Sequence, residues 1–201
     1  MSILPKLADV FRLITLRDEI YFRSDSLEML FKSFRLMRGI SSLDIGCGFQ
    51  PKNPFCAEKI SGLDLNSSSD RGIIAGDLSS GNLPFPCDCF DYVTAFDVLE
   101  HIPRVSRNGS ITTFPFVDLM REIHRILKPE GIFFSSTPCY PFKEAFQDPT
   151  HVNIMTEDTL RDYFSNDCWA TIYGFKGEFD ILKAGWFRKR HFVFLRKRSS
   201  N

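Results

Sequence analysis

Short apolar runs recur along the chain from residue 40 onward, and this pattern constrains the fold more than any other feature. Five of them lie at residues 42–45, 60–63, 72–75, 91–96 and 131–136, separated by Gly, Pro, Ser and Asp. Runs of this length between turn residues are typical of strands. Because they are apolar almost throughout, they favour a parallel sheet that is covered on both faces. We therefore predict a doubly wound, mostly parallel Rossmann-like α/β fold.

Patterns elsewhere in the chain complete this architecture. Apolar residues at helical spacing between residues 116 and 127 predict an amphipathic helix that ends before Pro129. Thr156 is predicted to cap a short helix after the fifth strand. Two late apolar runs, at residues 169–173 and 192–195, are predicted to close the sheet as a C-terminal antiparallel hairpin.

The connections after the first two predicted strands are unusually short. Residues 49–59 separate the first strand from the second, and residues 65–71 separate the second from the third. A crossover between parallel strands usually needs a dozen residues or more. We therefore expect the crossover helices after strands one and two to be shortened or missing, and one face of the sheet to be thinly covered.

Residues 1–39 differ in pattern from the rest of the chain. Apolar residues recur at helical spacing between residues 27 and 37, and a less regular helical pattern spans residues 4–14. We predict that residues 1–39 form an N-terminal helical segment packed on the core, and that residues 40–201 form the ligand-binding domain. The helix of residues 26–38 is expected to cover part of the sheet or of a ligand pocket.

Composition and charge exclude several classes of protein. Hydrophobic residues make up 43% of the chain and charged residues 25%, which is typical of a globular domain. Twenty-five basic residues balance twenty-five acidic ones, so we expect no nucleic-acid partner. No apolar run is long enough to span a membrane and the first residues lack an export signal, so we expect no membrane insertion and a cytoplasmic location. The six cysteines lack zinc-binding spacing, so reduced thiols are expected.

The first predicted strand ends in a glycine turn, Leu43-Asp44-Ile45-Gly46-Cys47-Gly48, and Asp64 ends the second. A glycine pair lets the backbone approach a ligand, and an acid at the next strand end can accept the hydroxyls of a ribose. The third glycine of the dinucleotide-binding pattern is missing, because residues 50 and 51 are Gln and Pro. Asp44 stands where dinucleotide-binding dehydrogenases have a small or apolar residue, and its carboxylate suits an ammonium group. The predicted ligand is therefore cationic at one end and a nucleoside at the other.

The order of the motifs resembles that of the class I S-adenosylmethionine-dependent methyltransferases, in particular their small-molecule branch. The resemblance runs from Leu43 to about Phe164. After the glycine turn it rests on Gly62-Leu63-Asp64-Leu65, Gly76-Asp77-Leu78, the stretch from Leu83-Pro84-Phe85 to Phe90-Asp91, Phe96-Asp97-Val98-Leu99-Glu100-His101-Ile102, and Leu127-Lys128-Pro129-Glu130-Gly131-Ile132. So many motifs in the same order as in the family are hard to obtain by chance.

This resemblance implies S-adenosylmethionine as the cofactor and gives roles to residues at several strand ends. The methionine end would be held by Asp44 and by the turn of Gly46, Cys47 and Gly48. Asp64 would bind the ribose and Asp77 the adenine amino group. The residues beside the cofactor would be Leu65, Leu78, Phe96 and Asp97. Taken singly, each of the three aspartates could instead hold a turn, and it is their ordered spacing that favours the cofactor.

Methyl transfer needs mainly in-line positioning, and a base helps where the acceptor is a hydroxyl. His151, in a polar loop after the fifth strand, is the predicted base, with Asp148 orienting its imidazole and Tyr140 lining the entrance. His101, which follows the fourth strand, is the second candidate. A structural role for His151 in holding its loop is the alternative.

The other polar candidates receive no role in catalysis. His124 is predicted to lie on the surface of the amphipathic helix, and His191 on a solvated strand edge. A metal held by Asp148 and His151 has no further ligand evident in the sequence, so no metal is predicted.

The predicted function is an S-adenosylmethionine-dependent methyltransferase that acts on a small-molecule acceptor, by O-methylation of a sugar, glycan or related metabolite. The stretch Asp148-Pro149-Thr150-His151 resembles one found in methyltransferase-domain proteins of bacterial sugar and surface-glycan pathways. The alternative is a non-catalytic S-adenosylmethionine-binding partner or regulatory protein. A nicotinamide-dependent dehydrogenase is a third reading, against which Asp44 and the missing third glycine argue. The sequence leaves the acceptor atom and the oligomeric state open.

Overall fold

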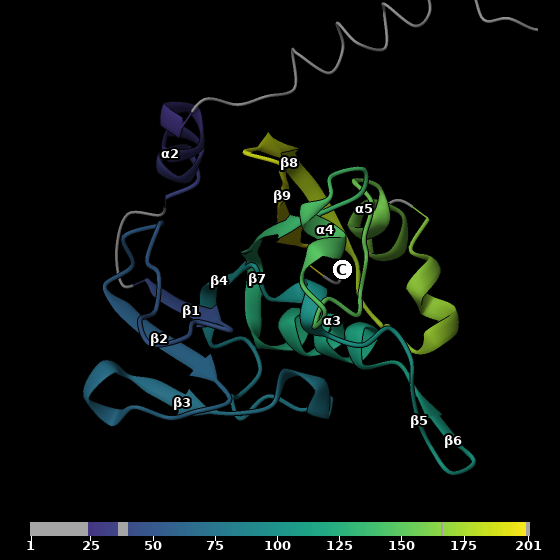
Figure 1. The fold of residues 1–201 in the computed structure, drawn as a ribbon. Helices are drawn as coiled ribbons and strands as arrows, with labels where there is room; N and C mark the ends of the chain where they lie inside the picture. Colours follow the sequence, from purple (N-terminus) through teal and green to yellow (C-terminus); the bar gives the residue numbers. More distant parts are fainter. Residues whose placement is uncertain (1–23, 36–39, 166, 200–201) are drawn as a thin grey trace, which may run out of the picture.

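Seven strands form one sheet in the order β3-β2-β1-β4-β7-β9-β8 (Figure 1), in a computed structural model that describes residues 24–35, 40–165 and 167–199. The parallel strands are β1 (Ser41–Ile45), β2 (Lys59–Asp64), β3 (Ile73–Ala75), β4 (Phe90–Phe96) and β7 (Leu127–Pro138). The antiparallel strands at one edge are β9 (Arg190–Lys197) and β8 (Phe179–Phe187). The predicted mostly parallel Rossmann-like sheet is therefore confirmed, and each predicted parallel strand is present.

Alternate residues of the central strands point to opposite faces of the sheet and build two separate cores. Val93 of β4 and Phe133 of β7 lie in the first core, whereas Tyr92 and Phe134 lie in the second. The first core is closed by the predicted amphipathic helix, α3 (Pro115–Ile126), whose fully buried residues are Leu119, Met120, Ile123 and Ile126. Burying an apolar side chain of this size stabilises the fold by about 1.5–3 kcal/mol.

The connections after β1 and β2 contain no α-helix, as predicted. Residues 46–58 form turns and loops, and the single turn η1 (Ser69–Arg71) separates β2 from β3. The ring of Phe55, in the first connection, stacks on Tyr92 with 3.9 Å between centroids. Phe31 of α2 (Ser24–Ser33) packs edge-on against Phe55, Phe134 and Phe194, with 4.7–5.2 Å between centroids. Aromatic rings therefore cover the face that lacks crossover helices.

The N-terminal helix has different bounds from those predicted. Helix α2 begins at Ser24 and ends at Ser33, whereas the pattern predicts residues 26–38. Residues 36–39 and the helix predicted at residues 4–14 lie outside the described residues. The division into residues 1–39 and 40–201 stays a prediction.

Short elements follow the C-terminal ends of the strands. After β3 comes η2 (Leu78–Ser80), and after β4 come η3 (Leu99–His101) and a ribbon of β5 (Ser106–Asn108) and β6 (Ile111–Thr113) that projects away from the sheet (Figure 1). After β7 come α4 (Glu144–Gln147), α5 (Thr159–Phe164) and η4 (Trp169–Tyr173). The prediction that Thr156 caps a helix is wrong, because α5 begins at Thr159. Among the described residues, no helix has the length and apolar character needed to cross a membrane.

The predicted hairpin has a different first strand. Residues 169–173 form the turn-like helix η4, flanked by Cys168 and Gly174 in left-handed conformation with φ of 46° and 91°. Such conformations end extended backbone, and the side chains of Trp169 and Ile172 are 50% and 76% exposed instead of lying in a sheet. The strand predicted at residues 169–173 is therefore wrong, and β8 is the partner of β9.

Two histidines predicted to lie at the surface are buried or half-buried. His191 lies on β9, which is an interior strand between β7 and β8, and burial lowers its pKa to about 4. His124 on α3 is half-buried with its ring edge-on to Phe175 and Phe179, and burial lowers its pKa to about 4 as well. The surface predictions are wrong because the C-terminal hairpin covers this side of the helix and extends the sheet beyond β9.

Candidate functional site

The turns that follow β1, β2, β3 and β4 lie along one edge of the sheet, because parallel strands all end on the same side. Ile45 of β1 is in register with Leu63 of β2 and with Ala95 of β4, and Asp64 is in register with Ala75 of β3. The sequence-predicted cofactor residues therefore gather at this edge. They are Asp44, the turn at residues 46–48, Asp64, Leu65, Asp77, Leu78, Phe96 and Asp97.

The glycine turn after β1 needs glycine for two different reasons. Gly46 has a φ of +64°, and a Cβ there would lie 2.2 Å from Cγ2 of Val98. Gly48 has a φ of +60°, but no heavy atom lies within 4 Å of an added Cβ, so this end of the turn faces open space. Cys47, between them, is buried, and burial raises the pKa of its thiol to about 11, which keeps the thiol neutral. The turn is therefore packed on Val98 at Gly46 and open at Gly48, so a ligand can approach the backbone at Gly48.

Asp44 lies beneath this turn and holds it to the neighbouring loop. Its carboxylate is 1% exposed and accepts the hydroxyl of Thr94 at 2.6 Å and the backbone amide of Lys52 at 2.8 Å. Burial raises the pKa of Asp44, and the two hydrogen bonds oppose that rise. These contacts are those of a turn-holding residue, and the role of Asp44 towards an ammonium group stays a prediction.

Asp64 joins the end of β2 to the glycine turn. Its Oδ2 accepts the amide of Gly48 at 2.8 Å, and its Oδ1 accepts the amide of Leu65 at 2.8 Å. Each carboxylate oxygen has a second lone pair, so the group can still accept hydrogen bonds from the hydroxyls of a ligand. Leu65 and Phe49 are 72% and 80% exposed, and they provide apolar surface next to this acid.

Asp77 and Leu78 occupy the turn after β3. The exposed Asp77 accepts the amide of Ser79 at 2.8 Å and so caps η2. Leu78 is 7% exposed and belongs to the core beneath α3. Asp77 therefore lies at the surface and Leu78 supports the turn from inside the core, and the predicted roles of both residues towards the cofactor stay predictions.

Phe96 and Asp97 mark the end of β4. The Phe96 ring is half-buried, with the ammonium of Lys52 4.5 Å from its centroid. Asp97 has a left-handed φ of 54° and forms an ion pair with Arg190 at 2.5 Å. Asp97 also lines a polar cleft, so it lies between the glycine-turn edge and that cleft.

The polar cleft has a volume of about 580 Å³ and lies between the loops that follow β4 and β7. Its charged or titratable lining residues are Asp97, Glu100, His101, Glu144, Asp148, His151 and Arg190. The structure therefore brings together the three predicted catalytic residues, His151, His101 and Asp148, although they come from two distant loops. The same loops are tied by the amides of Val152 and Asn153, which both donate to the carbonyl of Glu100 at 2.9 Å.

Glu100 is the most buried charged group of this cleft. It is 1% exposed, and its Oε2 accepts the hydroxyl of Thr137 at 2.5 Å. Its Oε1 has no hydrogen-bond partner among the described residues and lies 4.0 Å from Nε2 of His151. Burial raises the pKa of Glu100.

Backbone carbonyls orient both histidines. Nδ1 of His151 lies 3.1 Å from the carbonyl oxygen of Ala145, and Nδ1 of His101 lies 3.2 Å from that of Thr150. A carbonyl oxygen only accepts, so the proton of each neutral ring belongs on Nδ1 and the lone pair on Nε2. The two rings are edge-to-face with 4.9 Å between their centroids.

Asp148 has a different partner from the one predicted. Its Oδ1 accepts the amide of Thr150 at 2.8 Å and the hydroxyl of Thr150 at 2.6 Å, which lowers the pKa of Asp148. The Thr150 hydroxyl in turn lies 3.0 Å from Nδ1 of His101. Asp148 therefore orients Thr150 beside His101, whereas the carbonyl of Ala145 orients His151.

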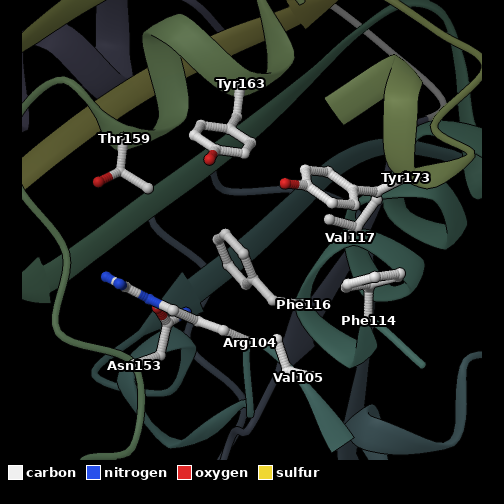
Figure 2. Close-up of a pocket in the computed structure, with 9 residues that line it drawn as sticks. All are labelled: Arg104, Val105, Phe114, Phe116, Val117, Asn153, Thr159, Tyr163 and Tyr173. Atoms are coloured by element: carbon white, nitrogen blue, oxygen red, sulfur yellow. The ribbon is translucent and has the colours of Figure 1, made fainter. Parts of the chain in front are cut away.

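A second, more apolar cavity of about 260 Å³ lies between α3, α5 and η4. Figure 2 shows the rings of Phe116, Tyr163 and Tyr173 around one space, with Arg104 and Asn153 at its side. Arg104 donates to Oδ1 of Asn153 at 2.6 Å, and the amide group of Asn153 donates to the carbonyl of Leu99. Asn153 is fully buried, so this polar pair links the cavity to the η3 loop that carries Glu100.

Sequence reasoning assigns no role to Glu100, Arg190, Arg104 or Asn153. Glu100 belongs to the motif that follows the fourth strand and stands next to His101, which is a predicted catalytic residue. That position in the sequence could have indicated a role for Glu100. Asn153 lies two residues after His151 in the same polar loop, which is a weaker indication of a role. Arg190 reaches Asp97 only because β9 pairs with β7, and no local pattern indicates that contact.

Comparisons with known proteins agree with this geometry. A family model described as a methyltransferase domain matches residues 16–167. The chain is 28% identical over 137 residues to a demethylmenaquinone methyltransferase of Geobacillus stearothermophilus, a match that covers 59% of this chain and 52% of the relative. The chain thus spans about half the length of the curated relatives it matches.

Solved structures share the fold at low sequence identity. A SAM-dependent methyltransferase from Aquifex aeolicus matches with a TM-score of 0.55 and 13% identity, over 84% of this chain and 88% of that chain. The [4+2]-cyclase SpnF matches with a TM-score of 0.57 and 18% identity, over 88% of this chain and 81% of that chain. At these identities the likeness shows the fold alone.

The strand order and the glycine turn define a Rossmann-like protein that binds its ligand at the C-terminal ends of its strands. The chain belongs to the methyltransferase domain family, within the class I S-adenosylmethionine-dependent methyltransferases. S-adenosylmethionine is the cofactor of this domain, and the residues present fit it. The turn at Gly48 is open, Asp64 keeps lone pairs for ribose hydroxyls, and Phe49 and Leu65 provide apolar surface for a purine. The assignment of single residues to parts of the cofactor stays a prediction.

Proposed function

We propose that this domain transfers the methyl group of S-adenosylmethionine to an oxygen atom of a small-molecule acceptor, in the class of sugars, glycans and related metabolites. The observation that carries the proposal is the polar cleft beside the strand-end edge, in which Glu100, His101 and His151 converge. Carboxylates, imidazoles and a guanidinium can each form a hydrogen bond with a hydroxyl group. A cleft lined by these groups therefore suits an acceptor that carries several hydroxyls.

The protein's task in this reaction is mainly positioning. S-adenosylmethionine, when bound, supplies a methyl group on a positively charged sulfur that is already strongly electrophilic. Asp64 would hold the ribose and Asp77 the adenine amino group, while Asp44 and the turn at residues 46–48 would hold the methionine end. The cleft then has to place the acceptor oxygen in line with the methyl group, at about 3 Å.

We assign the acceptor's proton to His151. Its Nδ1 is held by the carbonyl of Ala145, so the Nε2 lone pair is the one directed towards Glu100 and the cleft. The carboxylate of Glu100, 4.0 Å away, would stabilise the imidazolium that forms when Nε2 takes the proton. His101 is the second candidate base, and Asp148 acts on it as a positioning residue through Thr150.

A second candidate acceptor is a flat, largely apolar molecule. The aromatic cavity of Figure 2 favours it, because its rings could stack on such a ligand while Arg104, held by Asn153, binds a polar end. The curated relatives, which are named for demethylmenaquinone, support the same class. A non-catalytic cofactor-binding role is the remaining alternative.

The test is a calorimetric titration followed by a transfer assay. The full chain is titrated with S-adenosylmethionine and, as the control, with NAD. Radiolabelled S-adenosylmethionine is then incubated with the chain and with two pools of acceptors, one of sugars and glycans and one of aromatic and quinol compounds. Label in the first pool supports the proposal, and label confined to the second selects the apolar acceptor. Binding without transfer to either pool would reject methylation of these acceptor classes and favour the non-catalytic role.

A further inference from the structure

Three side chains that can ligate a metal ion converge in the polar cleft. Glu100, His101 and His151 each offer one ligand atom, and all three atoms lie within 4.8 Å of one another. Oε1 of Glu100 is buried, and none of the described residues donates a hydrogen bond to it. An unpaired carboxylate oxygen in the interior is costly, and a cation bound beside it would lower that cost.

The hydrogen bonds around the cluster leave the right atoms free for a metal ion. The carbonyls of Ala145 and Thr150 hold Nδ1 of His151 and of His101, which leaves Nε2 of both rings with its lone pair. Histidines that bind metals usually donate their other ring N–H to a carbonyl or carboxylate in this way. The hydroxyl of Thr137 likewise occupies Oε2 of Glu100 and leaves Oε1.

The frame that carries these atoms is already assembled. Both loops are joined by the amides of Val152 and Asn153, which donate to the carbonyl of Glu100 at 2.9 Å. Metal–nitrogen and metal–oxygen bonds of about 2.1 Å place neighbouring ligand atoms about 3 Å apart. Binding an ion would therefore require side-chain rotations that shorten the 4.0 Å gap between Glu100 Oε1 and His151 Nε2 and the other gaps of up to 4.8 Å by about 1–2 Å.

We propose that Glu100, His101 and His151 bind a divalent transition-metal ion, with its remaining coordination positions open to the polar cleft. Two imidazoles and one carboxylate suit ions such as Co²⁺, Mn²⁺ or Zn²⁺. Mg²⁺ and Ca²⁺ prefer oxygen ligands and are not expected to compete.

The catalytic consequence rests on the proposed function. The ion would coordinate the acceptor hydroxyl and stabilise the negative charge that develops on its oxygen. The O–H bond breaks and its proton leaves to water, the O–CH₃ bond forms, and the bond from the methyl carbon to sulfur breaks with its electron pair staying on sulfur. The Nε2 lone pair of His151 is then used for coordination, so the ion replaces the imidazole as the group that promotes proton loss.

The test uses the full chain after treatment with a chelator. Co²⁺ is titrated by calorimetry and followed by its visible absorption, which reports nitrogen and oxygen ligands. Cys56 and Cys87 are exposed, and their thiolates would instead add a strong near-ultraviolet band. We expect one Co²⁺ per chain without that band. Glu100→Gln and His101→Gln should each bind Co²⁺ at least about tenfold more weakly.

Glu144→Gln is the matched control, because Glu144 lines the same cleft but lies outside the cluster. It should bind Co²⁺ like the unmodified chain. No saturation by millimolar Co²⁺, or equal affinity in a folded Glu100→Gln or His101→Gln variant, would overturn the site. Circular dichroism establishes folding, and His101 is only half-buried, so its substitution remains informative if Glu100→Gln unfolds.

The metal site and the proposed function can fail separately. Co²⁺ binding without methyl transfer to either acceptor pool leaves the site in place and rejects the proposed acceptors. Methyl transfer that survives chelation unchanged, together with no Co²⁺ binding, rejects the site and leaves His151 as the base. Transfer that is lost on chelation and restored by Co²⁺ supports both.

Discussion

Replacing Gly46 by alanine is expected to disrupt the turn after β1. The residue has a φ of +64°, and an added Cβ would lie 2.2 Å from Cγ2 and 2.7 Å from Cβ of Val98. The left-handed conformation costs an alanine about 1 kcal/mol, and forcing a methyl group into a packed site costs about 1–3 kcal/mol more. We therefore expect the free energy of unfolding to fall by about 2–4 kcal/mol in urea denaturation.

Gly48→Ala is the matched control for this experiment. Gly48 has a similar φ of +60°, but nothing lies within 4 Å of an added Cβ, so only the conformational cost of about 1 kcal/mol is expected. In the double variant Gly46→Ala/Val98→Ala the contact is relieved, and the loss should be smaller than the sum of the two single losses. Equal losses in Gly46→Ala and Gly48→Ala would refute the reasoning, because close packing on Val98 would then not be what requires glycine.

Three further predictions concern catalysis, packing and pH. His151→Ala should leave cofactor affinity nearly unchanged and lower initial rates of methyl transfer by about 10²–10⁴-fold. Asp148→Asn should lower the rate only if His101 takes part, because Asp148 holds Thr150 beside His101 and does not contact His151. Deleting residues 1–38 removes Phe31, which is 6% exposed, from its aromatic neighbours, and should lower the melting temperature or abolish cofactor binding. Burial lowers the pKa of His191 to about 4, below the 6.5 expected when unfolded, so the unfolded chain takes up a proton first. The free energy of unfolding should therefore fall as the pH decreases from about 6.5 to about 4, with His191 alone contributing up to about 3 kcal/mol, and the fall should be less steep in His191→Gln.

Each of these predictions has a result that contradicts it. Turnover of His151→Ala within about threefold of the unmodified chain would remove His151 from the reaction. A truncated chain with unchanged melting temperature and cofactor affinity would show that residues 1–38 are an appendage. His124 has a pKa lowered to about 4 by the same cause, so His191→Gln should flatten the pH profile only in part. An identical profile in His191→Gln would exclude His191 as a source of the pH dependence.

The parallel half of the sheet could be predicted from the sequence because its signal is local. The apolar strands, the turn residues after them and the short connections after β1 and β2 all follow from neighbouring residues. The spacing from Asp44 to Asp64 places both acids near one sheet edge for the same reason, since parallel strands end together.

The C-terminal hairpin and the polar cleft depend on contacts that no local pattern shows. A short apolar run such as residues 169–173 fits a strand or a helical turn equally well. In the structure it forms the helical turn η4, between Cys168 and Gly174 in left-handed conformation. β8 contains a register shift between Ile181 and Lys183, which breaks the alternation expected of a strand. Glu100 is placed against His151 only when the loops after β4 and β7 meet, which requires the completed sheet.

The most direct test of the account is calorimetric titration of S-adenosylmethionine into the full chain and into Asp64→Ala. The account predicts saturable binding by the full chain, no saturation by millimolar NAD, and binding to Asp64→Ala that is weaker by about 1.5–3 kcal/mol, or about 10–150-fold. Asp70→Ala, at an exposed acid in η1, is the matched control and should bind normally. A folded Asp64→Ala variant that binds as tightly as the unmodified chain would contradict the assignment of the β2 end to the cofactor, and saturation by NAD would contradict the choice of cofactor.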